Sequence, residues 1–241
     1  MGQLMNSGAL LETRGLFGGY GGEQVLQGVD LFLNPGEIVA VIGRNGVGKS
    51  TLMRTLTGLL RPSAGTIRFA GSDVTSDTAD KRALRGFGYI PQGREVFPEL
   101  SVRENLLVGE VAGKGRNSPD YDTIYRFFPI LKERARQRAG TLSGGQQQQL
   151  AIARAMIGQP SLMLLDEPSE GIQPSIIKDI SRNVREMNAQ TGVAVLLVEQ
   201  NLDLIVSMAQ RGYVMEKGRL IAQLGPDEIK SRSEVRRYLT I

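Results

Sequence analysis

The nine residues from Gly43 to Thr51 have the composition and spacing of a phosphate-binding loop. Their sequence, GRNGVGKST, matches the pattern G-x-x-x-x-G-K-[ST], between an apolar strand and a helical pattern. Glycines let backbone N–H groups turn toward a β-phosphate, Lys49 would reach the β- and γ-phosphates, and the Ser50 hydroxyl would bind Mg²⁺. A chance glycine turn is disfavoured by this strand-loop-helix context. The predicted ATP-binding residues of this loop are Gly43, Arg44, Asn45, Gly46, Val47, Gly48, Lys49, Ser50 and Thr51.

Two adjacent carboxylates follow the apolar run at 162–165, which reads LMLL. A carboxylate at the end of a buried strand can project beside a phosphate loop and hold Mg²⁺, the role expected for Asp166. Glu167 would then face the attacking water as general base. Without the phosphate loop, a solvated strand end before a turn at Pro168 would be the better interpretation. With the loop present, catalysis by Glu167 and Lys49 is favoured.

The segment 142–146, LSGGQ, indicates the start of a helix with Ser143 as its N-cap. An uncovered helix N-terminus attracts anions, because its first N–H groups are unpaired and its dipole is positive there. A capped helix and an anion contact are therefore compatible interpretations of the same residues.

The residue types that are absent exclude several kinds of chemistry. The 241 residues include no cysteine and no histidine, which excludes disulfides, thiol catalysis, a Ser-His-Asp triad and the usual zinc sites. The net charge of +4 would permit an anionic partner, but the basic residues are scattered, so nucleic acid is not predicted. The longest apolar run, 193–198, is too short to cross a bilayer, and the N-terminus lacks a signal-peptide pattern. A cytosolic location is expected.

Strands and helices that could position these residues are visible as hydrophobic patterns. Continuous apolar runs at 38–42, 162–165 and 193–198 predict strands covered on both faces. The spacing of leucines after the phosphate loop predicts a helix that ends at Arg61-Pro62. Other predicted features are short strands between 10 and 33 with turns at 18–22 and 34–36, hairpins at 65–75 and around 217–218, and a short helix ending near 239.

Residues 93–140 have a different pattern from the rest of the chain. Ser101 with Glu104 three residues later predicts a capping box, and 124–139 is expected to be helical. We interpret this stretch as a helical subdomain inserted into an α/β core. The segment 142–146 would start a further helix directly after it.

These motifs, in this order, resemble the ATP-binding subunits of ABC transporters over essentially the whole chain. The resemblance implies a P-loop ATPase fold of class α/β, with a RecA-like core, an antiparallel β subdomain and an inserted helical subdomain. One domain would span 1–241, with 8–92 and 141–241 forming the core and β subdomain and 93–140 the helical subdomain. It also implies that ATP lies between two subunits, its γ-phosphate contacted by the opposite subunit's signature residues Ser143, Gly144, Gly145 and Gln146.

Further positions match the family less specifically. Tyr20 lies where the family has an aromatic residue that stacks on adenine, although a surface tyrosine in a glycine turn is the alternative. Gln92 matches the family's glutamine that senses Mg²⁺ and the membrane subunits, where a solvated loop glutamine is the alternative. The resemblance thus adds Tyr20 and Gln92 to the ATP site. It implies Ser50, Gln92 and Asp166 as the metal ligands, and a permease groove beside 93–98.

Two positions depart from the family pattern. Gln200 stands where a histidine usually contacts the γ-phosphate, and glutamine can donate a hydrogen bond but cannot carry a proton. The segment 170–173, EGIQ, lacks the usual aspartate of the family's D-loop, so that contact is in doubt. Gln200 is nevertheless expected to act with Glu167 and Lys49 in catalysis.

With these departures, the chain resembles the smaller ATP-binding subunits of one subset of importers, those for branched-chain amino acids and for urea or short amides. The segment 168–177, PSEGIQPSII, resembles the smaller urea-type ATPase most. The resemblance implies an ATPase at the cytoplasmic face of the inner membrane that powers uptake of a small nitrogen-containing solute. Its expected partners are transmembrane permeases, a second non-identical ATPase subunit (or a homodimer in isolation) and, indirectly, a solute-binding protein. The alternatives are a lipid or lipopolysaccharide exporter ATPase and a soluble ABC ATPase acting on nucleic acid or ribosomes.

Overall fold

The strands that flank the predicted catalytic residues form one six-stranded sheet. This computed structural model describes residues 8–113 and 118–239, and the sheet has the order β10-β9-β3-β8-β7-β6. All strands are parallel except β10, which pairs antiparallel with β9. The strands are β3 (Ile38–Ile42), β6 (Phe87–Ile90), β7 (Leu162–Asp166), β8 (Ala194–Glu199), β9 (Arg211–Glu216) and β10 (Arg219–Leu224). Every residue of β3, β7 and β8 is buried, which confirms the predicted doubly covered strands.

Each face of the sheet packs against different elements. Alternate residues of β3, Val39 and Val41, pack with Leu52 and Leu56 of α1 (Lys49–Thr57) and with the second sheet. The opposite face packs against α6 (Gly144–Ile157), α7 (Pro174–Thr191) and α8 (Leu202–Met208). Helix α1 ends at Thr57, before the predicted stop at Arg61-Pro62, because Gly58 adopts a left-handed conformation with φ of 80° and caps the helix. Leu59 is consequently outside the helix.

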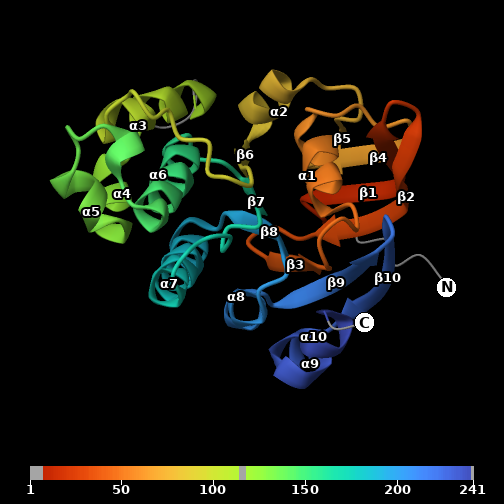
Figure 1. The fold of residues 1–241 in the computed structure, drawn as a ribbon. Helices are drawn as coiled ribbons and strands as arrows, with labels where there is room; N and C mark the ends of the chain where they lie inside the picture. Colours follow the sequence, from red (N-terminus) through yellow and green to blue (C-terminus); the bar gives the residue numbers. More distant parts are fainter. Residues whose placement is uncertain (1–7, 114–117, 240–241) are drawn as a thin grey trace.

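A four-stranded antiparallel sheet, of order β2-β1-β4-β5, packs over α1 (Figure 1). Its strands are β1 (Leu11–Tyr20), β2 (Glu23–Leu33), β4 (Ala64–Phe69) and β5 (Ser72–Asp73). The predicted turn at 18–22 was too long. Gly18 pairs with Leu26 and Tyr20 with Glu23, so β1 continues through the glycines and only Gly21 and Gly22 turn.

The helical lobe, α3 to α6, lies on the other side of the molecule from α1 and the four-stranded sheet (Figure 1). It contains α3 (Val102–Glu110), α4 (Tyr121–Phe127), α5 (Pro129–Glu133) and the 3₁₀ turns Val111–Gly113 and Ala139–Thr141. The capping box of Ser101 and Glu104 is confirmed. A single helix over 124–139 was wrong, since Phe128 leaves the helical region and Pro129 starts a new helix.

Three short helices complete the chain. Helix α2 (Ala79–Arg85) precedes β6 and was not predicted, and α9 (Pro226–Lys230) was also missed. The hairpin of β9 and β10 and the helix α10 (Arg232–Leu239) confirm the prediction for the C-terminal part. Within the described residues, no helix combines the length and the apolar character that crossing a membrane requires.

Candidate active site

The phosphate-binding loop lies between β3 and α1, with its tip exposed and its ends buried. Gly48, the N-cap of α1, has φ of 110°, a conformation that an L-residue with a side chain rarely adopts. The loop therefore turns directly into the first turn of the helix. Arg44, Asn45 and Gly46 are exposed, whereas Gly43, Gly48 and Lys49 are buried. Backbone N–H groups at the start of α1 thus face the loop, the arrangement that binds phosphate groups.

The Lys49 side chain is buried and occupies the centre of this loop. Its ammonium group donates to the carbonyl oxygens of Gly43 and Arg44 at 2.7 and 2.8 Å. It also forms an ion pair with Glu167, with 2.9 Å between Nζ and Oε1. Both side chains are almost fully buried, so this pair satisfies two charges that would be costly to bury alone. The predicted general base and the predicted phosphate-binding lysine are thus in direct contact.

Glu167 has an unusual backbone conformation for a residue with a side chain. Its φ is +46°, and its N–H donates to the Val198 carbonyl at 3.0 Å, which extends the pairing of β7 with β8. Left-handed non-glycine residues are costly and cluster at functional sites. Glu167 therefore combines a left-handed backbone, held by the hydrogen bond to Val198, with an ion pair to Lys49 through its side chain.

Asp166, at the end of β7, is buried between two hydroxyl groups. Ser50 Oγ donates to Oδ1 at 3.1 Å and Tyr89 Oη donates to Oδ2 at 3.2 Å. Burial raises the pKa of Asp166, and the two hydrogen bonds oppose that shift. Burial and the nearby Asp166 charge raise the pKa of the Tyr89 hydroxyl well above its usual range. A serine hydroxyl beside a carboxylate is an all-oxygen donor set, which fits Mg²⁺.

Gln92 lies on the same side, beside a cavity of about 220 Å³ lined by Ser50, Gln92, Asp166 and Glu170, among others. Its amide Nε2 donates to Glu170 Oε2 at 3.0 Å. Gln92 is therefore held by the turn that follows β7. The cavity brings together all three predicted metal ligands, with Gln92 at its exposed rim.

Gln200 is exposed at the end of β8 and shares a second cavity, of about 330 Å³, with Arg44 and Asn45 of the phosphate loop. The residue before it, Glu199, is buried and accepts hydrogen bonds from the backbone N–H groups of Gln200, Asn201 and Ser169. Burial raises the pKa of Glu199, and these backbone bonds oppose the shift. Glu199 thereby ties the Gln200 segment to the turn after β7.

The predicted signature residues form the start of α6. Ser143 Oγ accepts from the Gln146 N–H at 3.4 Å, and Gln146 Oε1 accepts from the Ser143 N–H at 3.0 Å, a complete capping box. Ser143 itself is exposed. Helices α6 and α1 lie in different parts of the molecule, so one chain does not bring its signature residues and its phosphate loop together (Figure 1).

Comparison with known proteins settles the family. A profile of the ABC transporter family matches residues 26–170, which include the phosphate loop, the signature residues and both carboxylates. The chain belongs to the ABC transporter family. As an ATP-binding subunit of this family, it binds and hydrolyses ATP.

Relatives of the ABC subunit match it over most of their length. The high-affinity branched-chain amino acid transport ATP-binding protein BraG of Pseudomonas aeruginosa is 43% identical over 206 residues, covering 84% of this chain and 87% of BraG. The lipopolysaccharide export system ATP-binding protein LptB of Escherichia coli K12 is 33% identical, covering 95% and 96%. A crystal structure of the ADP conformation of an ABC-transporter ATP-binding cassette matches with a TM-score of 0.80 at 29% identity, covering 96% and 95%. These matches confirm the predicted fold class.

Tyr20, predicted to stack on adenine, is the last residue of β1 and has 46% of its surface exposed. Its stacking on adenine stays a prediction. Sequence reasoning assigned no role to four residues around the ABC site: Tyr89, Arg94, Glu170 and Glu199. Glu170 stood in the segment 170–173 that departs from the family pattern, and Glu199 is a carboxylate directly after an apolar strand, as Asp166 is.

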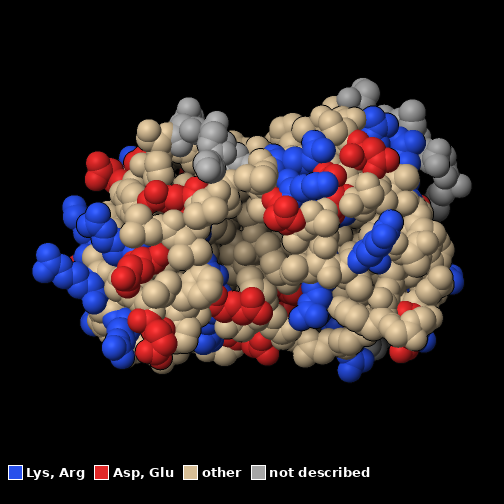
Figure 2. All heavy atoms as spheres, turned by 90° about the horizontal axis from the view of Figure 1, so that it is seen from above, with Lys and Arg blue, Asp and Glu red and all other residues tan. Residues whose placement is uncertain are grey.

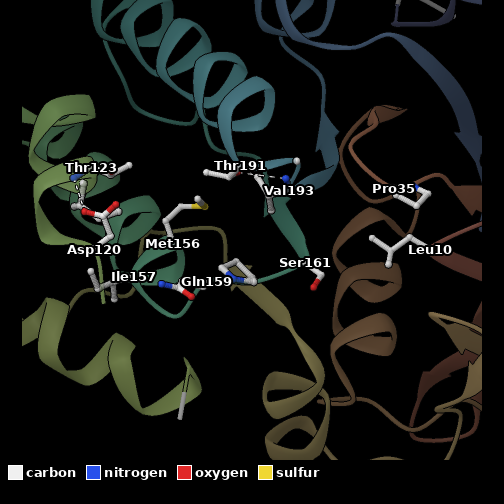
Figure 3. Close-up of a pocket in the computed structure, with 13 residues that line it drawn as sticks. Leu10, Pro35, Asp120, Thr123, Met156, Ile157, Gln159, Ser161, Thr191 and Val193 are labelled. Carbon is white, nitrogen blue, oxygen red and sulfur yellow. Dashed lines mark hydrogen bonds between the residues drawn. The ribbon is translucent and has the colours of Figure 1, made fainter. Parts of the chain in front are cut away.

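A larger cavity, of about 570 Å³, lies away from these residues. Figure 3 shows it between Asp120 and Thr123 on one side and Leu10 and Pro35 on the other. Ser161 and Val193, which line it, precede β7 and β8. The cavity thus lies at the opposite end of these strands from Asp166 and Glu199.

Proposed function

We propose that this ABC subunit hydrolyses ATP to power uptake of a small nitrogen-containing solute, either a branched-chain amino acid or urea and short amides. The main support for uptake is the 43% identity to BraG, a branched-chain amino acid transport protein, compared with 33% to the exporter protein LptB. The segment 168–177 supports the urea-type branch of the same subset.

The proposed reaction uses the residues gathered at β7 and α1. Glu167 takes a proton from the attacking water, while Lys49 and the phosphate-loop N–H groups hold the β- and γ-phosphates. Mg²⁺ held by Ser50, Asp166 and Gln92 would neutralise charge on the phosphate oxygens. Glu167 must leave Lys49 and Gln92 must leave Glu170 before these contacts can form, because both are paired with those residues. Tyr20 stacks on adenine, and Gln200 contacts the γ-phosphate.

The second half of each proposed ATP site comes from another subunit. Ser143, Gly144, Gly145 and Gln146 contact the γ-phosphate bound to the opposite phosphate loop, as the exposed Ser143 at the start of α6 permits. ATP then favours the closed pair because only ATP offers these contacts, and ADP does not. We propose that the assembled partner is a second, non-identical ATPase, since Gln200 leaves this subunit's own site without the usual histidine. Equal ATPase rates per site in the homodimer and the heteromer would contradict this asymmetry.

The proposed permease site is a groove of about 340 Å³ between α2, α3 and α6. Its lining is mostly apolar and includes Leu59, Phe97 and Val108, which are 61%, 44% and 40% exposed. Seen from above, the face that carries α2 and α3 is hollowed between the two halves of the molecule (Figure 2). Arg154 is the charged residue among those that line the groove. Docking of a membrane subunit there would hold the chain at the cytoplasmic face of the inner membrane, with a solute-binding protein acting indirectly through the permeases.

An uptake assay tests the solute proposal. A strain whose copy of this chain carries Glu167→Gln should lose uptake of radiolabelled leucine or urea, whereas the exposed control Glu186→Gln should retain it. Unchanged uptake of both solutes, with lipopolysaccharide retained in the inner membrane, would instead support the exporter alternative. Salt-sensitive binding of the purified chain to DNA or RNA would support the third alternative.

A further inference from the structure

Arg94 makes contacts that none of the expected roles explains. It follows Gln92 in the segment 91–95, which we call the glutamine loop. Here Gly93, Arg94 and Glu95 have φ values of 84°, 73° and 45°, so two residues with side chains adopt left-handed conformations in succession. Such conformations persist only where the surroundings fix them. The loop is closed by hydrogen bonds from Arg94 N to Pro91 O at 3.2 Å and from Glu95 N to Gly93 O at 2.9 Å.

The Arg94 guanidinium binds the turn that follows the catalytic strand. Its Nη2 donates to the carbonyl oxygens of Glu170 and Gly171 at 3.1 and 3.3 Å. Glu170 N–H in turn donates to the carbonyl of Glu167 at 3.2 Å. One side chain therefore connects the glutamine loop to the turn that starts at the predicted general base.

The same guanidinium lies against the first residue of α6. A Cβ built on Gly144 would be 2.8 Å from Arg94 Nη1 and 3.0 Å from Cζ. Gly144 is the first helical residue of α6, so its backbone conformation would accept alanine. The constraint at this position is the space that Arg94 occupies. Arg94, itself part of the glutamine loop, thus contacts both the turn after β7 and the start of α6.

We propose that Arg94 is a positioning residue that fixes the signature end of α6 relative to the turn after Glu167, so that one subunit presents its signature residues correctly to ATP on another. A planar guanidinium fits this geometry, because Nη2 reaches two carbonyls while Nη1 and Cζ lie against Gly144. This inference rests on the proposed trans contact between the signature residues and ATP.

Two measurements on purified protein test this role in a Glu167→Gln background, where ATP is bound but not consumed. Arg94→Ala should leave binding of a fluorescent ATP analogue to the single subunit unchanged. It should raise the dissociation constant of the ATP-dependent dimer, measured by sedimentation, about tenfold or more. Arg94→Lys should show a similar loss, because lysine keeps the charge but has no planar group to lie against Gly144. Arg182→Ala, an exposed arginine on α7, is the matched control and should change neither value.

Gly144→Ala supplies an independent variant, since its Cβ displaces Arg94 without straining the helix. It should weaken dimerisation to a similar degree, and Arg94→Ala with Gly144→Ala should be no weaker than either alone. The positioning role would be overturned if the two substitutions together raised the dimer dissociation constant by the product of their single effects. It would also be overturned if either Arg94→Ala or Arg94→Lys dimerised normally. A Glu167→Gln reference that fails to dimerise with ATP would overturn a trans site between two copies of this chain, and the role of Arg94 in presenting it.

Discussion

At the scale of single residues, the ion pair between Lys49 and Glu167 lies at the centre of the site. The two charges are 2.9 Å apart and buried, so neither is free for the role proposed for it until the pair separates. An incoming phosphate is the natural competitor, because it offers Lys49 more negative charge than one carboxylate. We therefore expect ATP binding and release of Glu167, the proposed general base, to be one event.

Glu167→Gln should lower the ATP hydrolysis rate by a factor of roughly 10² to 10⁴ while ATP binding is retained, because an amide cannot accept the proton from water. The dimer should accumulate in the ATP-bound form, visible as a stable species in size-exclusion chromatography. Glu186→Gln changes an exposed carboxylate of α7 in the same way and should hydrolyse ATP normally. Unchanged turnover in Glu167→Gln would contradict the assignment of the base.

Tyr89→Phe should raise the Mg²⁺ concentration needed for half-maximal ATPase activity roughly tenfold, because it removes a hydrogen bond that orients Asp166. The Tyr89 bond lowers the pKa of Asp166, which burial raises, so its loss moves that pKa further up. A metal ligand must be ionised, so the defect should be larger at pH 6 than at pH 8. Magnesium titrations of the ATPase rate at both pH values measure it.

Tyr125→Phe, in the helical lobe, is the matched control for that titration and should leave the magnesium dependence unchanged. A Tyr89→Phe defect of equal size at both pH values would show that the hydroxyl acts in some way other than through the ionisation of Asp166.

At the scale of elements, Arg82 of α2 holds the far end of α1. Its buried guanidinium donates to the carbonyl oxygens of Thr55 and Leu56, at 2.8 and 2.7 Å, and to those of Asp77 and Thr75 at 3.2 and 3.0 Å. Carbonyls at the end of a helix lack partners within it, so this side chain caps α1. The helix that begins at the phosphate loop is thus fixed at both ends.

Arg82→Ala should lower the free energy of unfolding by about 3 kcal/mol, because it leaves several carbonyls without partners and opens a cavity. Chemical denaturation measures this loss. The neighbouring Arg85 is largely exposed and pairs with Asp77 at the surface, so Arg85→Ala should cost less than about 1 kcal/mol. Equal losses in both variants would contradict the capping role.

The sequence allowed prediction of those elements whose pattern is local. Continuous apolar runs identified β3, β7 and β8 because strands covered on both faces need no polar alternation. Helix α2 was missed since its one fully buried side chain is the polar Arg82, which leaves no apolar stripe. The contact of Tyr89 with Asp166 spans 77 residues, and no local pattern encodes such a pair.

At the scale of the whole molecule, the ATP site and the groove between α2, α3 and α6 lie beside the same strand, β6. Tyr89 lines both the groove and the cavity around Asp166, and the glutamine loop follows directly after β6. A membrane subunit docked in the groove would therefore be separated from Asp166, a proposed metal ligand, by the single side chain of Tyr89. This proximity is a physical basis for coupling hydrolysis to transport.

Val108→Lys should prevent assembly with the membrane subunits while the isolated chain keeps its ATPase rate, because docking would bury a second cation in the groove that Arg154 already lines. Leu107→Lys is the matched control. It lies next to Val108 on α3 with similar exposure, 44% against 40%, but does not line the groove. Co-purification with the membrane fraction measures assembly, and equal loss in both variants would contradict docking in the groove.

The pairing of Lys49 with Glu167 also has a consequence for the end of the cycle. Glu167 is an anion tethered beside the lysine, so it acts as an internal competitor of the phosphates for the same cation. Once the γ-phosphate has left, the carboxylate can replace it on Lys49 and speed the departure of ADP. A subunit without that carboxylate should hold both ADP and ATP more tightly. Its exchange of ADP for ATP would then be slow even where hydrolysis itself is fast.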